Sequence, residues 1–205
     1  MGNLWPSGNP YSVGSLLAAV LSLTMGAAMA SERTRLIDDF SGDLSTLGTR
    51  WQGFTDRVMG GRSDLQAGYD TRDGEPILVL RGQVRLDNNG GFVQVRLPLD
   101  VEGRPVNAGS AGGLRVTARA VIPGPYYVHL RTTDTRRPWA YYRAPLSLGA
   151  DWTVVTVPWS AFEARSLDRA LDPGRLTSLA LVAYGEEFEA HLEVMRLEWL
   201  PLSEE

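Results

Sequence analysis

The sequence contains no cysteine and no lysine, and its 205 residues include only two histidines. Without cysteine, the chain has no disulfide, no thiol nucleophile and no cysteine-ligated metal site. Without lysine, it has no Schiff base, no Ser-Lys dyad and no Walker-type phosphate loop. Because His129 and His191 are the only imidazoles, a three-histidine zinc site is excluded. These absences remove several kinds of catalytic and metal site.

Basic charge in excess and long helical patterns are also absent. All 20 basic residues are arginines, and the formal net charge is −4, so the chain has no overall positive field to attract nucleic acid. The length favours one domain, and an apolar share of 43% is enough to build a sizeable core.

The first thirty residues carry no charged side chain and end in Ala28-Met29-Ala30, the A-x-A form of a signal-peptidase site. We interpret residues 1–30 as a signal peptide, which predicts an exported, periplasmic protein. Signal peptides normally begin with positive charge, which this segment lacks. The alternative is a mis-assigned start: translation begins at Met25 or Met29, and the protein is cytoplasmic.

The body of the chain has a hydrophobic period of two. Residues 114–119, for example, place Leu, Val and Ala on one face and Arg, Thr and Arg on the other. Ten or so such short runs, bounded by Gly, Pro, Asn or Asp, predict an all-β sandwich or barrel over residues 36–200, followed by a tail at 201–205. One short helix at most is expected, around residues 160–169.

Two glycine pairs interrupt the strand-like runs, in T-D-R-V-M-G-G-R-S-D from Thr55 and in R-L-D-N-N-G-G-F from Arg85. The simplest interpretation is structural: Asn89-Gly90 signals a hairpin, and the first run is a tight loop in which Met59 fills the core. The alternative is a polar recess lined by backbone N–H groups, which binds an anion or a carbonyl oxygen. In that case Asn88 or Asn89 would add an amide, and Arg57 or Arg62 a planar guanidinium.

Aromatic and basic side chains share strand faces further along the chain. Alternation places Tyr127, His129 and Arg131 on one face of their strand, and Trp139, Tyr141 and Arg143 on one face of the next. If the two strands are neighbours, these side chains form a surface that suits a protein interface or sugar stacking. The alternative is an ordinary half-exposed sheet with arginines extending into solvent.

Catalysis by His129, Arg131 and an acid is a third hypothesis. A lone histidine on a strand is more often structural, and the sequence has no nucleophile-elbow motif and no clear pair of catalytic carboxylates. We therefore expect no enzyme activity and no cofactor. Asp38, Asp39 and Asp43 suggest a structural calcium site, although their spacing is not that of an EF-hand.

Several motifs occur in a characteristic order: D-R-V-M-G-G-x-S, N-N-G-G-F-x-Q-V-R, Y-Y-V-H-L-R-T, Y-Y-R-A-P-L and W-T-V-V-T-V-P-W-S-A-F. Together they resemble the CIA30 family, the complex I intermediate-associated protein 30 domain, over residues 37–199. The resemblance implies a jelly-roll β-sandwich similar to galactose-binding and carbohydrate-binding modules. The best-known member of that family is a mitochondrial assembly chaperone for NADH:ubiquinone oxidoreductase.

By this resemblance, the chain is a non-catalytic binding or assembly module that engages a protein partner, in a respiratory or envelope membrane complex, through a sheet face and the glycine loops. The alternative is a carbohydrate-binding module. The candidate binding residues are Asp56, Arg57, Asn88, Asn89, Arg96, Tyr127, His129, Arg131, Trp139, Tyr141 and Arg143. The candidate structural loop residues are Met59, Gly60, Gly61, Ser63, Gly90, Gly91 and Phe92. The sequence departs from the family pattern at Arg62 and Asp87, which lie within the two loops.

Overall fold

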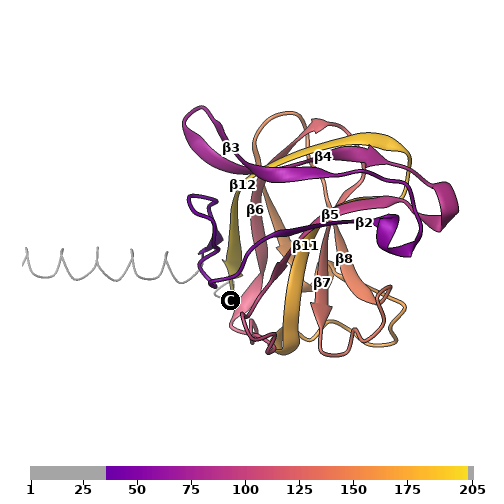
Figure 1. Cartoon of the computed structure of the whole chain (residues 1–205). Coiled ribbons are helices and arrows are strands. Elements are labelled where there is room, and N and C mark those ends of the chain that lie inside the picture. Colours follow the sequence, from indigo (N-terminus) through magenta and orange to yellow (C-terminus); the bar gives the residue numbers. More distant parts are fainter. Residues whose placement is uncertain (1–35, 203–205) are drawn as a thin grey trace, which may run out of the picture. The chain divides into compact units, whose positions relative to one another are not determined.

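Two six-stranded antiparallel sheets form the body of the computed structural model, which describes residues 36–202 (Figure 1). Sheet A contains, in spatial order, β3 (Gln66–Arg72), β4 (Glu75–Val84), β12 (Phe188–Pro201), β6 (Ala111–Ile122) and β9 (Thr153–Pro158), and β1 (Leu36–Asp38) also pairs with β12. Sheet B contains, in spatial order, β10 (Glu163–Arg165), β8 (Tyr141–Leu146), β7 (Tyr126–Thr132), β11 (Leu176–Tyr184), β5 (Phe92–Pro98) and β2 (Gln52–Thr55). The predicted signal peptide lies outside the described residues, as does most of the predicted tail. None of the helical segments in residues 36–202 is long and apolar enough to cross a membrane.

Alternation explains why these runs form strands. In β5, the inward side chains of Val93, Val95 and Leu97 are buried, while the residues between them are partly exposed. The inward residues of both sheets form one core, and its largest fully buried side chains are Tyr126 and Tyr142. A strand with one buried and one exposed face has the period of two that the sequence shows.

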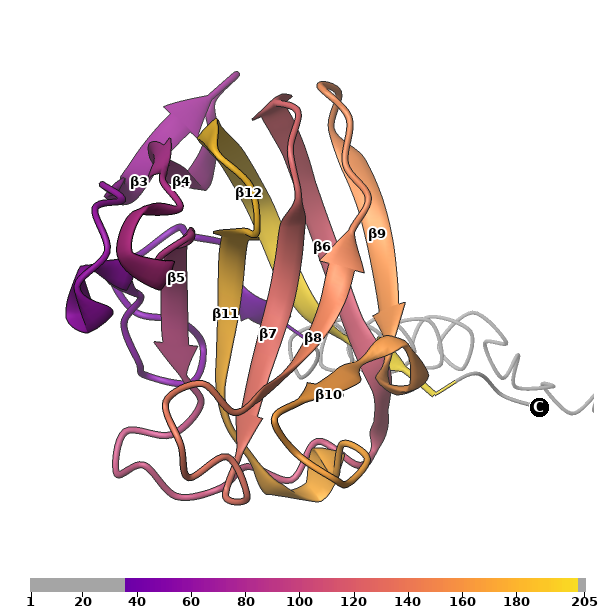
Figure 2. The ribbon, with the colours of Figure 1, turned by 90° about the vertical axis from the view of Figure 1, so that its right-hand side faces the viewer.

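The chain changes sheet repeatedly, as Figure 2 shows for the strands from β3 to β12. It passes from β2 in sheet B to β3 in sheet A, and later from β4 in sheet A to β5 in sheet B. Such crossings are typical of a jelly roll, in which successive strands are shared between two packed sheets. The predicted all-β class and jelly-roll sandwich are confirmed.

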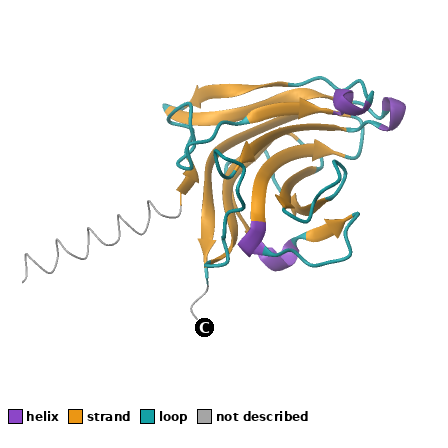
Figure 3. Cartoon of the chain, turned by 60° about the horizontal axis from the view of Figure 1, so that its bottom comes forward, coloured by secondary structure: helices purple, strands orange, loops and turns teal. Residues whose placement is uncertain are grey.

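The helical segments are four short 3-10 turns (Figure 3), and the described residues contain no α-helix. They are η1 (Asp56–Met59), η2 (Asp87–Asn89), η3 (Trp159–Ala161) and η4 (Pro173–Arg175). The helix expected around residues 160–169 was wrong. After η3, Phe162 turns into the core and β10 pairs with the edge of β8, so the backbone hydrogen bonds go to the sheet.

Candidate functional site

The two glycine pairs lie on neighbouring corners, where the chain passes between the sheets. The corner from β2 to β3 carries η1 and Gly60-Gly61, and the corner from β4 to β5 carries η2 and Gly90-Gly91 (Figure 1, right). Asn88 Nδ2 donates a hydrogen bond of 3.0 Å to the Gly60 carbonyl oxygen and links the corners. The hairpin expected at Asn89-Gly90 was therefore wrong, because β4 and β5 belong to different sheets.

The carboxylate of Asp56 joins these corners from inside. Its Oδ1 accepts a 3.0 Å hydrogen bond from the Ser63 N–H. Its Oδ2 accepts a 2.6 Å bond from the Gly91 N–H and another from the Ser63 hydroxyl. Asp56 is completely buried, so it offers no surface to a ligand. The backbone N–H groups do hold an anion, as the recess hypothesis requires, but that anion is the chain's own side chain.

Glycine is required beside this carboxylate because there is no room for a side chain. A Cβ atom added at Gly61 would lie 2.4 Å from Asp56 Oδ1, and one added at Gly90 would lie 2.4 Å from Asp56 Oδ2. Gly60 has a φ of +92°, which favours glycine for a different reason. The Ser63 hydroxyl also accepts a 2.9 Å bond from the Arg85 N–H, so both corners depend on the same polar core.

The outer surface of the first corner is apolar. Val58 is 72% exposed and Met59 is 52% exposed, so the expectation that Met59 fills the core was wrong. Arg57 Nε donates a 2.9 Å hydrogen bond to the Ser63 carbonyl oxygen and holds the turn from outside. Of the other predicted loop residues, Phe92 begins β5 and is partly buried, whereas the Asn89 side chain is not described.

The second candidate region is the outer face of sheet B, the face turned away from the core. Strand register places Arg96 of β5, Ala180 of β11, His129 of β7 and Arg143 of β8 in one row across four adjacent strands (Figure 2). We call these four positions the arginine row. β7 and β8 are therefore neighbours, as the interpretation of their aromatic faces required.

Four ring side chains pack together around His129 of this row, and we call them the aromatic cluster: Tyr127, His129, Tyr141 and Tyr184. The His129 and Tyr141 rings stack with centroids 4.2 Å apart, and the Tyr127 and Tyr184 rings meet edge to face at 6.3 Å. Tyr184 was not among the predicted binding residues. It shares its outward parity on β11 with Ala180 and Val182, so the same alternation could have found it.

His129 is held neutral within the cluster. Its burial and the nearby Arg143 lower the pKa of His129 to about 3. Its Nε2 atom is buried and has no hydrogen-bond partner among the described residues. At neutral pH such an imidazole is a weak proton acceptor, because an efficient general base has a pKa close to the working pH.

Arg131 fixes a loop. Its guanidinium donates hydrogen bonds to the carbonyl oxygens of Thr135 at 2.6 Å, Arg137 at 2.9 Å and Pro138 at 3.0 Å. The next residue, Trp139, is 54% exposed. Burial, with a smaller contribution from Arg96, lowers the pKa of Arg131. Arg131 therefore positions the loop that presents Trp139.

The two arginines of the row rest on aromatic rings. The Arg96 guanidinium lies 4.2 Å from the centroid of Phe54, and that of Arg143 lies 5.1 Å from the centroid of Tyr127. Burial lowers the pKa of Arg96. The carboxylate nearest to Arg143 is that of Glu163, at 3.9 Å, and this side chain is 69% exposed. The row thus combines positive charge with flat apolar surfaces.

The acidic residues considered for calcium bind different partners. Asp38 accepts hydrogen bonds from the Phe40 N–H and the Trp51 indole N–H, and Asp43 lies 3.4 Å from Arg50. Asp39 accepts a hydrogen bond from the Ser41 hydroxyl. In residues 36–202, no three His, Asp or Glu side chains lie close enough together to hold a metal ion. The calcium site stays a prediction.

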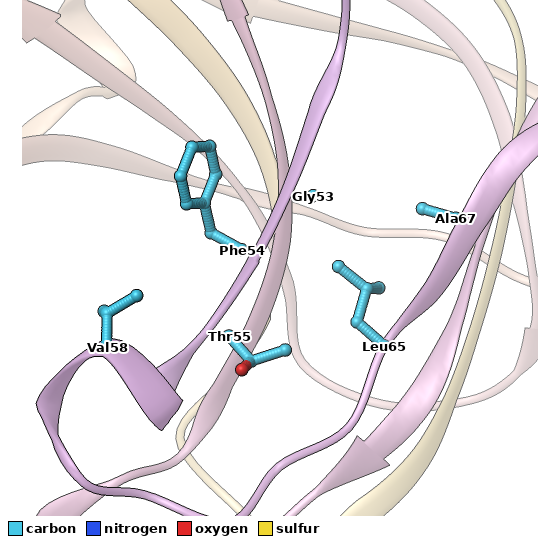
Figure 4. Close-up of a pocket in the computed structure, with 6 residues that line it drawn as sticks. All are labelled: Gly53, Phe54, Thr55, Val58, Leu65 and Ala67. Atoms are coloured by element: carbon cyan, nitrogen blue, oxygen red, sulfur yellow. The ribbon is translucent and has the colours of Figure 1, made fainter.

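A shallow hollow opens between the edge strands β2 and β3. Figure 4 shows Leu65 and Thr55 in the space between the strands, while the Phe54 ring extends to the other side of β2. Val58, on the exposed turn η1, also lines the hollow. Its lining exposes both polar and apolar surface, and Val58 belongs to the hollow and to the exposed first corner.

Solved structures with a similar fold include two carbohydrate-binding modules and part of an agarase. The family 11 module of the cellulase Lic26A-Cel5E of Clostridium thermocellum is 14% identical, with a TM-score of 0.63 over 83% of this chain and 95% of that chain. The family 11 module from Clostridium thermocellum in complex with a beta-1,3-1,4-mixed-linked tetrasaccharide is 13% identical, with a TM-score of 0.61 over 83% and 97%. An exo-beta-agarase is 9% identical, with a TM-score of 0.54 over 83% of this chain and 25% of the enzyme.

No curated protein matches this sequence. The family model described as Complex I intermediate-associated protein 30 (CIA30) matches residues 39–194. This range includes both glycine corners, the arginine row and the aromatic cluster. By that match, the chain belongs to the CIA30 family.

Proposed function

We propose that this protein is a non-catalytic binding module that holds a saccharide on the outer face of sheet B. The observation that carries the proposal is the meeting of the arginine row and the aromatic cluster on one rigid sheet face. Tyrosine rings offer apolar surface for sugar rings, and hydroxyl, guanidinium and amide groups bind sugar hydroxyls. The architecture shared with the family 11 modules supports the proposal by analogy of fold.

Two features support binding without catalysis. A glycosidase usually needs two carboxyl groups on either side of the scissile bond. On the outward positions of the sheet B strands, the one acidic side chain is Glu163, at the edge. His129, the proton acceptor considered from the sequence, has a pKa of about 3. Neither feature favours proton transfer near neutral pH.

Binding of the full-length chain to defined oligosaccharides, measured by glycan array and calorimetry, tests this proposal. Tyr127→Ala removes one ring of the cluster and should abolish most of the binding. Tyr69→Ala is the matched control, because Tyr69 is a partly exposed tyrosine on β3 of sheet A. A chain that binds no saccharide, or a Tyr69→Ala variant that loses as much as Tyr127→Ala, would contradict the proposal.

A second candidate function is docking to a protein partner, and a different surface favours it. Val58, Met59 and Leu86 are exposed apolar side chains on the two linked corners, which the buried Asp56 makes rigid. Exposed apolar side chains on a rigid surface often mark protein contacts. The family's name, complex I intermediate-associated protein, agrees with such a role, and a membrane respiratory or envelope complex is the partner we propose.

Site-specific photo-crosslinking in intact cells tests docking at the corners. A crosslinker at Met59 should capture one reproducible partner, and Val58→Asp should prevent the capture. A crosslinker at Leu44, an exposed apolar residue outside the two corners, is the control. Equal capture from Leu44 and Met59 would show that the corners are not a specific docking site.

A further inference from the structure

Resting on the proposed function, we propose that the saccharide is anionic, with carboxylate groups of uronic acid type that bind to the arginine row. A neutral sugar can use the rings and hydrogen-bond donors of this face, but only an anionic sugar also compensates its positive charge. The positive charge on the outer face of sheet B, and the way in which that charge is neutralised, therefore distinguish an anionic from a neutral saccharide.

Charge on this face is one-sided. The outward positions of sheet B include Arg96, Arg131, Arg143 and, on the edge strand, Arg165, against the single acid Glu163. The chain as a whole has a net charge of −4. Concentrated positive charge on one face of an acidic protein attracts anionic ligands by electrostatic complementarity.

Arg96 is the clearest case. Its guanidinium is partly buried against Phe54, and it forms no ion pair with any residue that the structure describes. Removing a guanidinium from water without a counter-ion is unfavourable, and an incoming anion would offset that cost. A planar guanidinium matches a carboxylate, because two parallel N–H groups donate to two oxygens.

The spacing of the row fits an extended ligand. Arg96 and Arg143 lie three strands apart in one register row. With a strand spacing of about 4.8 Å, their Cα atoms are roughly 14 Å apart. The two side chains therefore address two separate anionic groups on one chain, as a polyuronate provides, rather than one small ion.

The floor of the face favours a slim polar ligand over a protein segment. Ala180 and Val182 point outward yet are only 4% and 1% exposed, because larger neighbours overhang them. None of the exposed large apolar side chains in residues 36–202 lies on a strand of sheet B. A protein interface usually depends on such apolar anchors, whereas hydroxyl and carboxylate groups do not.

Calorimetric titration of the full-length chain tests the inference with matched ligands. The probes are tetragalacturonate, its methyl ester, the neutral mixed-linked β-glucan tetrasaccharide and a glutamate-rich peptide. We expect tetragalacturonate to bind about tenfold or more tightly than its ester. Its affinity should also fall as sodium chloride rises from about 50 mM to about 500 mM, because salt screens partly exposed charges.

Variants connect the charge effect to the row. Arg96→Gln should weaken tetragalacturonate binding about tenfold, and Arg143→Gln should do the same at the other end of the row. Arg62→Gln makes the same change of charge on an exposed residue of the first corner and should alter binding less than about twofold. Thermal melting of each variant verifies that it is folded.

The outcomes separate the two proposals. The anionic inference is overturned if tetragalacturonate binds no more tightly than its ester or the neutral tetrasaccharide, and if Arg96→Gln has no effect. Saccharide binding still stands in that case if Tyr127→Ala loses it. If no saccharide binds, or if only the glutamate-rich peptide binds, both proposals are overturned.

Discussion

Both outer faces of the sandwich carry arginines, but the two sheets neutralise them differently. On sheet A, the Glu193 side chain is 1% exposed, and its carboxylate forms ion pairs with Arg72 Nε at 3.1 Å and Arg119 Nη2 at 2.7 Å. His191 lies 3.2 Å from the same carboxylate. On sheet B, Arg96 and Arg131 pack against a ring and backbone carbonyls, and Arg143 has a distant, exposed acid.

The difference distinguishes a face whose charges are paired within the fold from the face that we propose binds the ligand. On sheet A, burial raises the pKa of Glu193, but the hydrogen bonds and charges of Arg119 and Arg72 outweigh burial and lower it overall. On sheet B, burial lowers the pKa values of Arg96 and Arg131, so their charged forms are disfavoured. Charges that lack partners within a fold are often found at functional sites.

The largest expected effect is at Asp56, a buried carboxylate of the corners that N–H and O–H donors stabilise and that has no ion pair within residues 36–202. Asp56→Asn places an amide NH₂ or a neutral oxygen among donors, so we expect a loss of about 3 kcal/mol in the free energy of unfolding. Urea denaturation measures it. Asp87→Asn, on the exposed second corner, is the control and should change stability by less than about 0.5 kcal/mol. A small loss for Asp56→Asn would mean that the corners hold without their shared carboxylate.

A smaller loss of stability is expected at Glu193, the carboxylate that pairs with Arg72 and Arg119 on sheet A. Glu193→Gln keeps the shape of the side chain but leaves Arg72 and Arg119 without their shared counter-ion. Because both arginines are partly exposed, we expect a loss of about 2 kcal/mol, between the values for buried and surface pairs. Glu189→Gln, an exposed change on the same strand, should be nearly neutral by urea denaturation. Equal effects of the two variants would remove the distinction between the faces.

Paired and unpaired arginines give a direct comparison of the two sheets. Arg119→Gln removes a 2.7 Å ion pair and should cost about 1 kcal/mol. Arg96→Gln removes an arginine without an acid partner in residues 36–202 and should cost less than about 0.5 kcal/mol. Denaturation midpoints of both variants measure the difference. If Arg96→Gln is the more damaging change, Arg96 is a structural residue and the binding proposal loses its main support.

The smallest expected effect is a dependence on pH. Since the folded pKa of Glu193 is lowered, its carboxylate contributes stability above the unfolded pKa of about 4.3. That contribution is lost as the pH falls through the lower folded pKa. The stability difference between the wild-type chain and Glu193→Gln should therefore shrink when urea denaturation is repeated at decreasing pH below about 5. A difference that stays constant would mean that the charge of Glu193 contributes little.

Much of the fold follows from local pattern. The alternation in β6 and β7 predicted which side chains share a face: Leu114, Val116 and Ala118 all enter the core, because a strand between a core and solvent turns every second residue inward. The edge strands β2 and β3 were missed. Their sequences Q-G-F-T and Q-A-G-Y-D-T-R are mostly exposed, and backbone pairing with a neighbour defines them more than burial does.

The candidate site was predictable to a lesser degree. The sequence predicted that Tyr127, His129 and Arg131 share one face of a strand, but it did not place Tyr184 on that face. It also gave no sign that Arg96 would have no acid partner in residues 36–202. Local signals also misled: Asn89-Gly90 has the same appearance in a hairpin and in a crossing between sheets. Turn propensity describes a bend, not the sheet to which the next strand belongs.

The sequence by itself determined the all-β class, the inward residues of β6 and the exclusion of thiol and lysine chemistry, because composition and a period of two are local properties. Only the tertiary structure decided that Gly91 would meet Asp56, 35 residues earlier in the chain, and that four strands would align Arg96 with Arg143. Contacts between distant segments depend on how the sheets pair and stack, which no local pattern encodes.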